Sequence, residues 1–269
     1  MSALALQAHP EPLPSYQPSG QEIPLFEAAY RHGLPVLLKG PTGCGKTRFV
    51  EHMAARLRRP LVTVSCHDDL SATDLLGRHL IGQDGTYWVD GPLAHAVRTG
   101  SICYLDEVVE ARKDTTVILH ALTDDRRMLP IERTGECLIA PPEFMLVVSY
   151  NPGYQQLLKG LKPSTRQRFV SLSFDFPEAR REACIVETEA GIDAATARRL
   201  VSLAKALRAS AEYDLEEAPG TRLLVSAGRL MAAGIAPREA CRVGMLECLS
   251  DDPGVISALG DIVDAVFEA

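Results

Sequence analysis

Three glycines, a lysine and a threonine follow an apolar run near the start of the chain in a spacing that suits phosphate binding. The segment is Gly40-Pro41-Thr42-Gly43-Cys44-Gly45-Lys46-Thr47, with Arg48 directly after it, and it fits the pattern G-x-x-x-x-G-K-[ST]. Glycines allow successive backbone N–H groups to turn toward phosphate oxygens, and the start of a following helix adds partial positive charge. Lys46 suits the β- and γ-phosphates, and the Thr47 hydroxyl suits Mg²⁺. The segment therefore predicts a site for ATP and Mg²⁺.

Two carboxylates end a second apolar run, Ser101-Ile102-Cys103-Tyr104-Leu105-Asp106-Glu107. Asp106, at the end of a predicted strand, suits the coordination shell of Mg²⁺, and Glu107 can polarise a water molecule for attack on the γ-phosphate. This arrangement is typical of a nucleotide hydrolase. The alternative is an acidic turn in solvent that happens to follow a buried strand.

Polar residues also flank two further apolar runs. Asn151 follows the run 144–149 within the sequence Tyr150-Asn151-Pro152-Gly153, at the carboxyl end of a predicted strand, where open α/β sheets bind their ligands. Asn151 is therefore a candidate for holding the attacking water or sensing the γ-phosphate, and a turn with a purely geometric role is the alternative. Arg166 and Arg168 precede the run 169–174, where basic residues on their own are typical of a solvated face.

The elements that must position these residues alternate between two patterns. Short β-rich runs lie at 36–39, 61–64, 102–105, 144–149 and 169–174, and helical patterns lie at 46–58, 92–99 and 111–123. Such alternation predicts an α/β fold with a mostly parallel sheet.

Strand signals end after Pro177. Helices are predicted at 178–190, 194–211, 221–233, 237–249 and 253–268, and Pro237 and Pro253 fit first-turn positions. At the other end of the chain, five prolines between positions 10 and 24 predict an extended arm, which could pack on a neighbour. We therefore expect a proline-rich arm over 1–20, an α/β core over 21–177 and a helical domain over 178–269.

Two segments interrupt the α/β pattern, and each is predicted to form a small hairpin. One is 83–88, with the aromatic pair Tyr87 and Trp88, and the other is 126–140, with Thr134 and Gly135 at its middle. The aromatic pair could grip another protein or form the hairpin's own small core.

Composition excludes several classes of protein. The chain has 269 residues, of which 46% are hydrophobic, so it can bury a sizeable core. Its net charge of −7 makes nucleic acid a poor default partner. No apolar run is long enough for a membrane span, so we expect no membrane partner and a cytoplasmic location. The seven cysteines lack Cys-x-x-Cys spacing and are predicted to be reduced core thiols.

The order of these motifs resembles the AAA+ superfamily, and within it the CbbQ/NirQ/NorQ group of the MoxR branch. The residues that carry the resemblance are the phosphate loop with 48–53, Cys66-His67-Asp68-Asp69-Leu70, Asp90-Gly91-Pro92-Leu93, 104–112, 149–154, 164–169 and Thr221-Arg222-Leu223-Leu224. Together they cover nearly the whole chain after residue 20. The resemblance implies an AAA+ P-loop NTPase core, a parallel sheet sandwiched by helices, followed by a C-terminal all-helical lid.

Several roles follow from the resemblance alone. Arg168, or Arg166 beside it, is implied as the arginine finger that enters the neighbouring subunit's site, and Arg222 as a second sensor that reaches the nucleotide from the lid. An interfacial site implies a ring, usually a homohexamer. The two hairpins resemble inserts that face the pore and the partners of such a ring.

The resemblance implies an ATP-hydrolysing motor that remodels a protein client together with a von Willebrand factor A domain adaptor, similar to CbbO. Reactivation of inhibited Rubisco, as in CbbQ, is the function we expect, and activation or maturation of nitric oxide reductase, as in NirQ and NorQ, is the alternative. Three alternative functions come from other classes of protein. They are a P-loop kinase, a DNA-acting AAA+ loader or helicase, and a scaffold that hydrolyses ATP too slowly to act as a motor.

Overall fold

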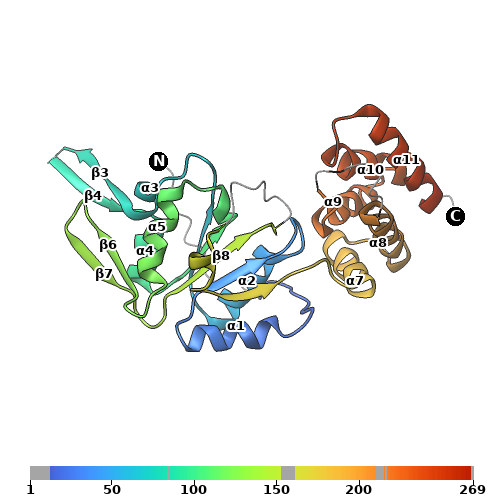
Figure 1. Cartoon of the computed structure of the whole chain (residues 1–269). Helices are drawn as coiled ribbons and strands as arrows, with labels where there is room; N and C mark the ends of the chain where they lie inside the picture. Colours follow the sequence, from blue (N-terminus) through green and yellow to red (C-terminus); the bar gives the residue numbers. More distant parts are fainter. Residues whose placement is uncertain (1–12, 84, 153–160, 210–214, 216, 268–269) are drawn as a thin grey trace. The chain divides into compact units, whose positions relative to one another are not determined.

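The computed structural model describes residues 13–83, 85–152, 161–209, 215 and 217–267. The chain divides into two compact units. One runs to Gly40 and continues with Lys46–Ser173, and the other combines Pro41–Gly45 with the chain from Phe174 onward. Figure 1 shows a sheet with flanking helices in the first unit and helices alone in the second. The proline-rich arm up to residue 12 lies outside the described residues.

A five-stranded parallel sheet forms the centre of the first unit. Its order is β2-β5-β8-β1-β9, and every neighbouring pair is parallel. The strands are β1 Val36–Lys39, β2 Leu61–Ser65, β5 Ile102–Asp106, β8 Met145–Tyr150 and β9 Val170–Ser173. All five predicted strands are thus confirmed, each within one or two residues at its ends.

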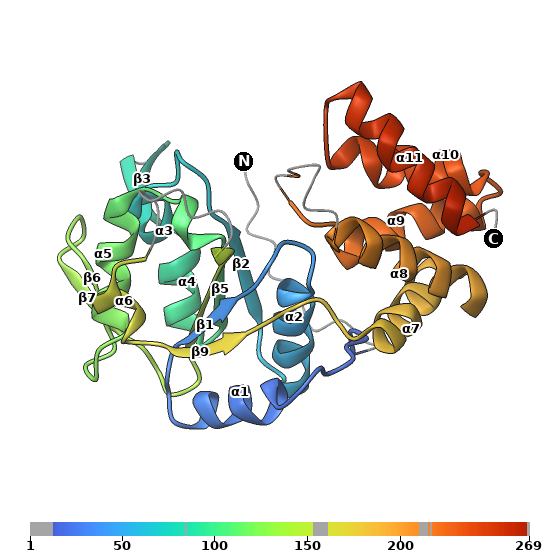
Figure 2. The same ribbon diagram turned by 45° about the vertical axis from the view of Figure 1, so that its right-hand side comes forward.

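Helices cover both faces of this sheet, as Figure 2 shows for α2 on one face and α4 with α5 on the other. They are α1 Glu22–Arg31, α2 Lys46–Leu57, α3 Ala72–Leu76, α4 Pro92–Thr99, α5 Lys113–Leu122 and α6 Pro163–Arg166, with a short 3₁₀ turn, η1, at Val108–Glu110. The consecutive strand residues Leu37 and Leu38 point to opposite faces of the sheet and are both fully buried, because each face is covered. The predicted α/β class is confirmed.

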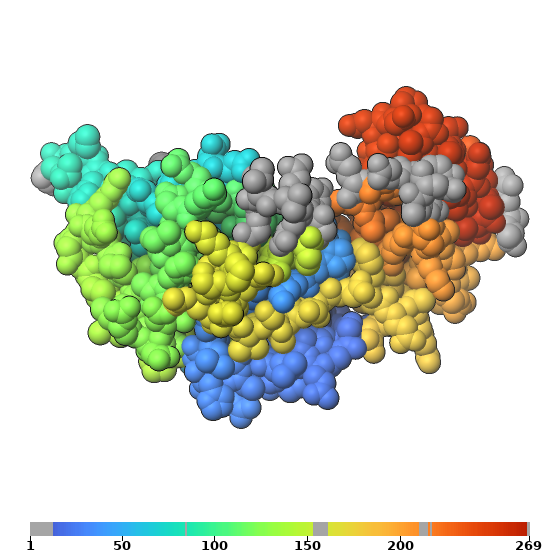
Figure 3. All heavy atoms as spheres, viewed as in Figure 1, coloured from blue at the N-terminus to red at the C-terminus, as the bar shows by residue number. Residues whose placement is uncertain are grey.

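The two predicted hairpins are present, and the first is longer than expected. It pairs β3 Gly77–Gly82 with β4 Gly85–Asp90, and the second pairs β6 Met128–Ile131 with β7 Glu136–Ile139. Trp88 packs edge-on against His79, whereas Tyr87 is about half exposed. Arg98 on α4 binds both hairpins, through Asp90 and Glu136. In the space-filling view of Figure 3 the first hairpin, in cyan, projects from the α/β unit.

Five helices form the second unit around a separate apolar core. They are α7 Ala179–Ala190, α8 Ala194–Ala209, α9 Thr221–Ala232, α10 Pro237–Gly244 and α11 Pro253–Phe267, with a short 3₁₀ turn, η4, at Leu246–Cys248. Leu200, Leu203, Ala204 and Leu207 on α8 are buried in this core, as their spacing predicts.

Two expectations need correction. The predicted helix 237–249 is interrupted at Met245, directly after Gly244, where the missing side chain allows close approach to Ala227 of α9. Pro24 was predicted to lie in the extended arm, but it occupies the first turn of α1. The missing N–H of a proline is tolerated there, because backbone N–H groups in the first turn have no partner within the helix. The described end of the arm packs on α2, since Tyr16 lies 5.3 Å from Phe49 between ring centroids and the Pro14 carbonyl lies 2.9 Å from His52 Nδ1, and packing of the arm on a neighbour stays a prediction.

The seven cysteines carry thiols and form no disulfides in the structure, but only some are in the core. Cys137, Cys184 and Cys248 are exposed, whereas Cys44, Cys66, Cys103 and Cys241 are buried. The prediction failed for the exposed three because Cys137 lies in a two-stranded hairpin, and Cys184 and Cys248 lie on the outer side of helical turns whose apolar neighbours face the core. Within the described part of the chain, every helix is too short or too polar to span a bilayer.

Candidate nucleotide-binding site

The predicted phosphate loop connects β1 to α2 at the carboxyl end of the central sheet. Gly43 and Gly45 have φ angles of +73° and +99°, a region that favours glycine, and a Cβ added to Gly45 would meet no atom within 4 Å. Lys46 begins α2, so the start of that helix faces the loop. The Lys46 Nζ donates a hydrogen bond to the Gly40 carbonyl over 2.8 Å. This open turn at a helix start has the form that receives phosphate.

The two predicted Mg²⁺ ligands lie next to each other. Thr47 Oγ1 in the first turn of α2 is 3.3 Å from Asp106 Oδ2 at the end of β5. A hydroxyl and a carboxylate are the hard oxygen ligands that Mg²⁺ prefers, and Mg²⁺ keeps several waters besides one or two protein groups. The residues present therefore fit the ion.

Two hydroxyl groups that the sequence reasoning missed hold the Asp106 carboxylate. The Tyr104 hydroxyl donates to Asp106 Oδ1 over 2.6 Å, and the Ser149 hydroxyl donates to the same oxygen over 2.5 Å. Burial and the Asp106 charge raise the pKa of Tyr104, so its hydroxyl stays protonated and remains a donor. Ser149 is a polar residue within β8 that directly follows the apolar residues Met145–Val148, and that was the available signal.

Glu107 has an unusual backbone conformation that Ser149 also supports. Its φ angle is +54°, a left-handed conformation that costs a side-chain-bearing residue about 1–2 kcal/mol. Its N–H donates to Ser149 Oγ over 3.0 Å, and its side chain is exposed. Ser149 thus fixes both the carboxylate of Asp106 and the backbone from which the Glu107 carboxylate extends.

Cys66, directly after β2, lies near both carboxylates. Burial, with the negative charges of Asp106 and Glu107, raises the pKa of its thiol to about 12. The thiol is therefore neutral at physiological pH and presents no thiolate to a nucleotide.

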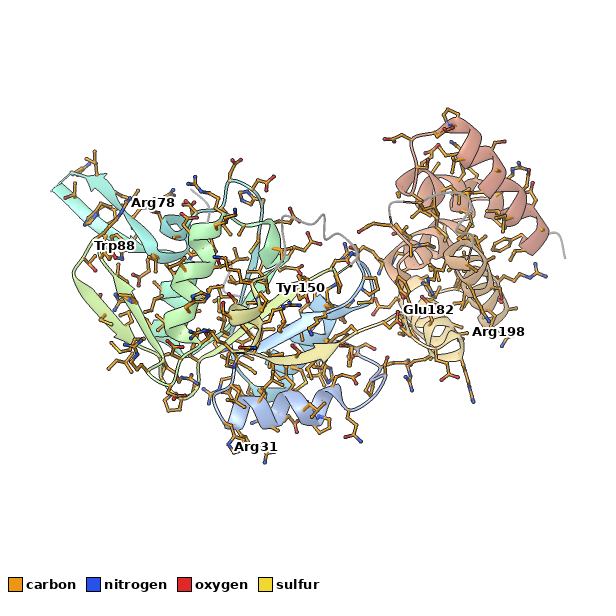
Figure 4. All side chains as sticks on the ribbon, in the orientation of Figure 1. Arg31, Arg78, Trp88, Tyr150, Glu182 and Arg198 are labelled. Atoms are coloured by element: carbon orange, nitrogen blue, oxygen red, sulfur yellow. The ribbon has the colours of Figure 1, made fainter. Side chains whose placement is uncertain are left out.

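Asn151 comes directly after β8, the strand between β1 and β5. The Gly40 N–H donates to the Tyr150 carbonyl over 3.4 Å, which links the start of the phosphate loop to the residue before Asn151. Figure 4 labels Tyr150 at this end of the strand. Asn151 therefore leaves the sheet between the strands that carry the phosphate loop and Asp106. Gly153 and Tyr154 of the same motif lie outside the described residues.

The two candidate arginine fingers lie near the end of α5. Arg168 forms an ion pair with Asp124 and donates to the His120 carbonyl over 3.5 Å. The side chain of Arg166 is exposed at the end of α6. Desolvation, together with the charges of Arg168 and Lys162, lowers the pKa of His120, whose Nε2 lies 2.9 Å from Thr165 Oγ1.

Arg222 lies in the first turn of α9, in the unit that also contains Pro41–Gly45. Its side chain is exposed, and its Cβ lies 3.8 Å from the position of a Cβ added to Gly43. Arg222 is therefore close enough to the loop for its long side chain to extend along it.

A parallel sheet with a phosphate loop after β1, an acidic pair at the end of β5 and a polar residue after β8 defines a P-loop ATPase of the AAA+ class. The model for the AAA domain of the dynein-related subfamily matches residues 35–169, and the model for the CbbQ/NirQ/NorQ C-terminal domain matches residues 182–266. The chain is thus an ATP-hydrolysing enzyme that binds nucleotide, and it belongs to the CbbQ/NirQ/NorQ group of MoxR-type AAA+ proteins.

Known relatives support this assignment along nearly the whole chain. The denitrification regulatory protein NirQ of Pseudomonas aeruginosa is 67% identical over 93% of this chain and 96% of its own length. The protein CbbQ of Hydrogenophilus thermoluteolus is 52% identical over 94% of this chain and 95% of its own length. A solved mutant of RuvB from Thermotoga maritima matches with a TM-score of 0.55 and 19% identity, over 94% of this chain and 73% of that one, which shows a shared fold.

Proposed function

We propose that the chain hydrolyses ATP at the site around Lys46, Thr47 and Asp106. Lys46 and the backbone N–H groups of 42–48 bind the phosphates, and Thr47 and Asp106 bind Mg²⁺, which neutralises charge on the phosphates when bound. Glu107 accepts a proton from the attacking water, and Asn151 orients that water. The 3.3 Å separation of Thr47 Oγ1 from Asp106 Oδ2 is the observation that carries this proposal.

The motor's client is, in this proposal, nitric oxide reductase during its activation or maturation. Identity with the denitrification regulatory protein NirQ, at 67%, exceeds identity with CbbQ, at 52%, over similar lengths. The similarity therefore favours the denitrification alternative over the Rubisco reactivation that the sequence motifs had led us to expect. A kinase gains no support, since the chain matches an AAA domain and then a CbbQ/NirQ/NorQ C-terminal domain.

We further propose that the active unit is a homohexameric ring that acts with a von Willebrand factor A domain adaptor. In such a ring Arg168, or Arg166, stabilises transition-state charge at the neighbouring subunit's site, an effect worth about 10³ to 10⁵ in rate where arginine fingers have been studied. Mixing Arg168→Ala with Lys46→Ala subunits should then restore turnover, because some interfaces pair an intact loop with an intact finger. Mixed rings that form without rescue would show that each site is complete in one chain.

A complementation experiment tests the function. In a denitrifying strain without its own NirQ, the parent chain should restore reduction of nitric oxide, and chains with Lys46→Ala or Glu107→Gln should not. In vitro, Lys46→Ala should lose ATP affinity, whereas Glu107→Gln should bind ATP and hydrolyse it about 10² to 10⁴ times more slowly. Restored Rubisco reactivation together with unrestored nitric oxide reduction would instead identify the client as Rubisco.

A further inference from the structure

A buried carboxylate in the helical unit lies outside every motif discussed so far. Glu182, labelled on α7 in Figure 4, has 1% of its surface exposed. Arg208 of α8 binds it through two parallel hydrogen bonds of 2.8 and 2.7 Å, and the Thr221 hydroxyl donates to it over 2.7 Å. We call these three residues the Glu182 network. It joins α7, α8 and the first residue of α9.

Arg208 extends this network to two further segments. Its Nε donates to the Pro219 carbonyl over 2.9 Å, and its guanidinium lies 3.8 Å above the centre of the Phe176 ring. Phe176 belongs to the segment that follows β9, and Pro219 lies just before α9. One planar guanidinium therefore fixes the direction in which the chain enters α9, because its donors have a rigid geometry that a lysine cannot reproduce.

The start of α9 also packs against Pro41–Gly45, the phosphate-loop residues that belong to the same unit. A Cβ added to Gly220 would lie 2.7 Å from the Thr42 carbonyl oxygen and 2.9 Å from Gly43 Cα, so only glycine fits there. Thr42 Oγ1 donates to Glu217 Oε1 over 2.6 Å. Arg222, the proposed second sensor, follows Thr221 directly. A small rotation at Thr221 would therefore displace Gly220 and Arg222 with respect to the loop.

A buried ion pair is a poor source of stability, because desolvation of the two charges offsets most of their attraction. Its geometric effect is larger, since the side chains of Glu182 and Arg208 are only 1% and 16% exposed and each hydrogen bond constrains the other. We propose that Glu182, Arg208 and Thr221 are positioning residues that orient Arg222 toward bound nucleotide and thereby set nucleotide affinity. This inference rests on the proposed role of Arg222 at the ATP site.

A double-mutant cycle tests the proposal with the binding of ATP and ADP, measured on the full chain with a fluorescent nucleotide. Thr221→Val removes the hydroxyl and keeps the shape, and Thr221→Ser restores the hydroxyl. Thr196→Val is the matched control, because Thr196 also donates to a carboxylate, Asp193, over 2.6 Å at a helix start in the same unit. Thermal unfolding of every variant is measured in parallel.

Thr221→Val should weaken nucleotide binding by about fivefold or more, the scale expected when a buried hydrogen bond is lost, with Thr221→Ser and Thr196→Val close to the parent. In the Arg222→Ala background, Thr221→Val should add less than about twofold, because both changes act through one side chain. Fully additive losses, or parental binding by Thr221→Val, would overturn the proposal. If Thr221→Val does not fold, Arg208→Lys takes its place in the cycle with the same criteria. Loss of binding in Lys46→Ala tests the ATP site itself, so the two failures are distinguishable.

Discussion

Two carboxylates, Asp106 in the α/β unit and Glu182 in the helical unit, are each held by hydroxyl groups but differ in how their charge is balanced. The described contacts of Asp106 are with the hydroxyls of Tyr104, Ser149 and Thr47. Glu182 is matched by the Arg208 guanidinium as well as by Thr221. Hydroxyls orient a carboxylate without cancelling its charge, whereas a guanidinium cancels it. Asp106 is therefore suited to attract a cation, and Glu182 is suited to fix a fold.

The largest expected effect is on folding, at Glu182. Glu182→Gln keeps the shape and removes the charge, which leaves the mostly buried Arg208 without its counter-ion and should cost about 3–5 kcal/mol in the free energy of unfolding. Glu187→Gln is the control, since Glu187 is exposed on the same helix. Urea denaturation followed by circular dichroism measures both. Equal stability of the two variants would contradict the role assigned to the Glu182 charge.

Asp106→Asn should have the opposite effect to Glu182→Gln: it should lower ATPase activity and leave the stability of the fold nearly unchanged. The amide can still accept from Tyr104 and Ser149, so we expect little change in the denaturation midpoint. Loss of the negative charge should raise the Mg²⁺ concentration required for hydrolysis, or lower the rate, by about a hundredfold. Removal of a group that merely supports a metal ligand costs about 10- to 100-fold, and loss of a ligand should cost at least as much. Titration of ATP turnover with Mg²⁺ checks this. An unchanged Mg²⁺ dependence would remove Asp106 from the metal site.

Ser149→Ala should have a smaller, kinetic effect. It removes the hydroxyl that binds both Asp106 and the Glu107 N–H, so ATP affinity should persist while the hydrolysis rate falls about tenfold. Ser171→Ala, at an exposed position of β9 in the same sheet, should leave both unchanged. Separate measurement of nucleotide binding and single-turnover hydrolysis distinguishes the two quantities. Weaker binding with an unchanged rate would mean that Ser149 supports the loop instead of the carboxylates.

The sequence predicted much of the site around Asp106, whereas of the Glu182 network it pointed only to Thr221, as part of a family motif and without a role. Lys46, Thr47 and Asp106 lie beside strand and helix boundaries, so local spacing was enough to bring them to one edge of a parallel sheet. Ser149 required the register of β8 against β5, which pairs Leu105 with Val148, and spacing within one strand does not define it. Glu182 and Arg208 required the packing of α7 on α8. Such contacts depend on tertiary structure, so residue type alone gives no signal for them.

The smallest expected effect is the loss of an exposed ion pair, which contrasts with the loss of the buried pair at Glu182. Arg242 on α10 binds Glu239 over 2.5 Å and also pairs with Glu247, and all three side chains are well exposed. Water and salt screen such contacts, so Arg242→Ala should shift the melting temperature by less than about 2 °C at physiological ionic strength. The same measurement on Glu182→Gln provides the contrast.

The pH dependence of this small shift follows from Glu239. Its hydrogen bond with Arg242 lowers the pKa of the Glu239 carboxyl. A carboxyl whose pKa falls on folding stabilises the fold above its ordinary pKa and loses that contribution as the pH drops through the folded-state value. The difference between the parent and Arg242→Ala should therefore be present at pH 7, disappear in acid and shrink with added salt. A difference that persists unchanged in acid and in high salt would show that Arg242 acts through the packing of its aliphatic stem. The contrast with the Glu182 network would then be one of burial alone, with no part for charge.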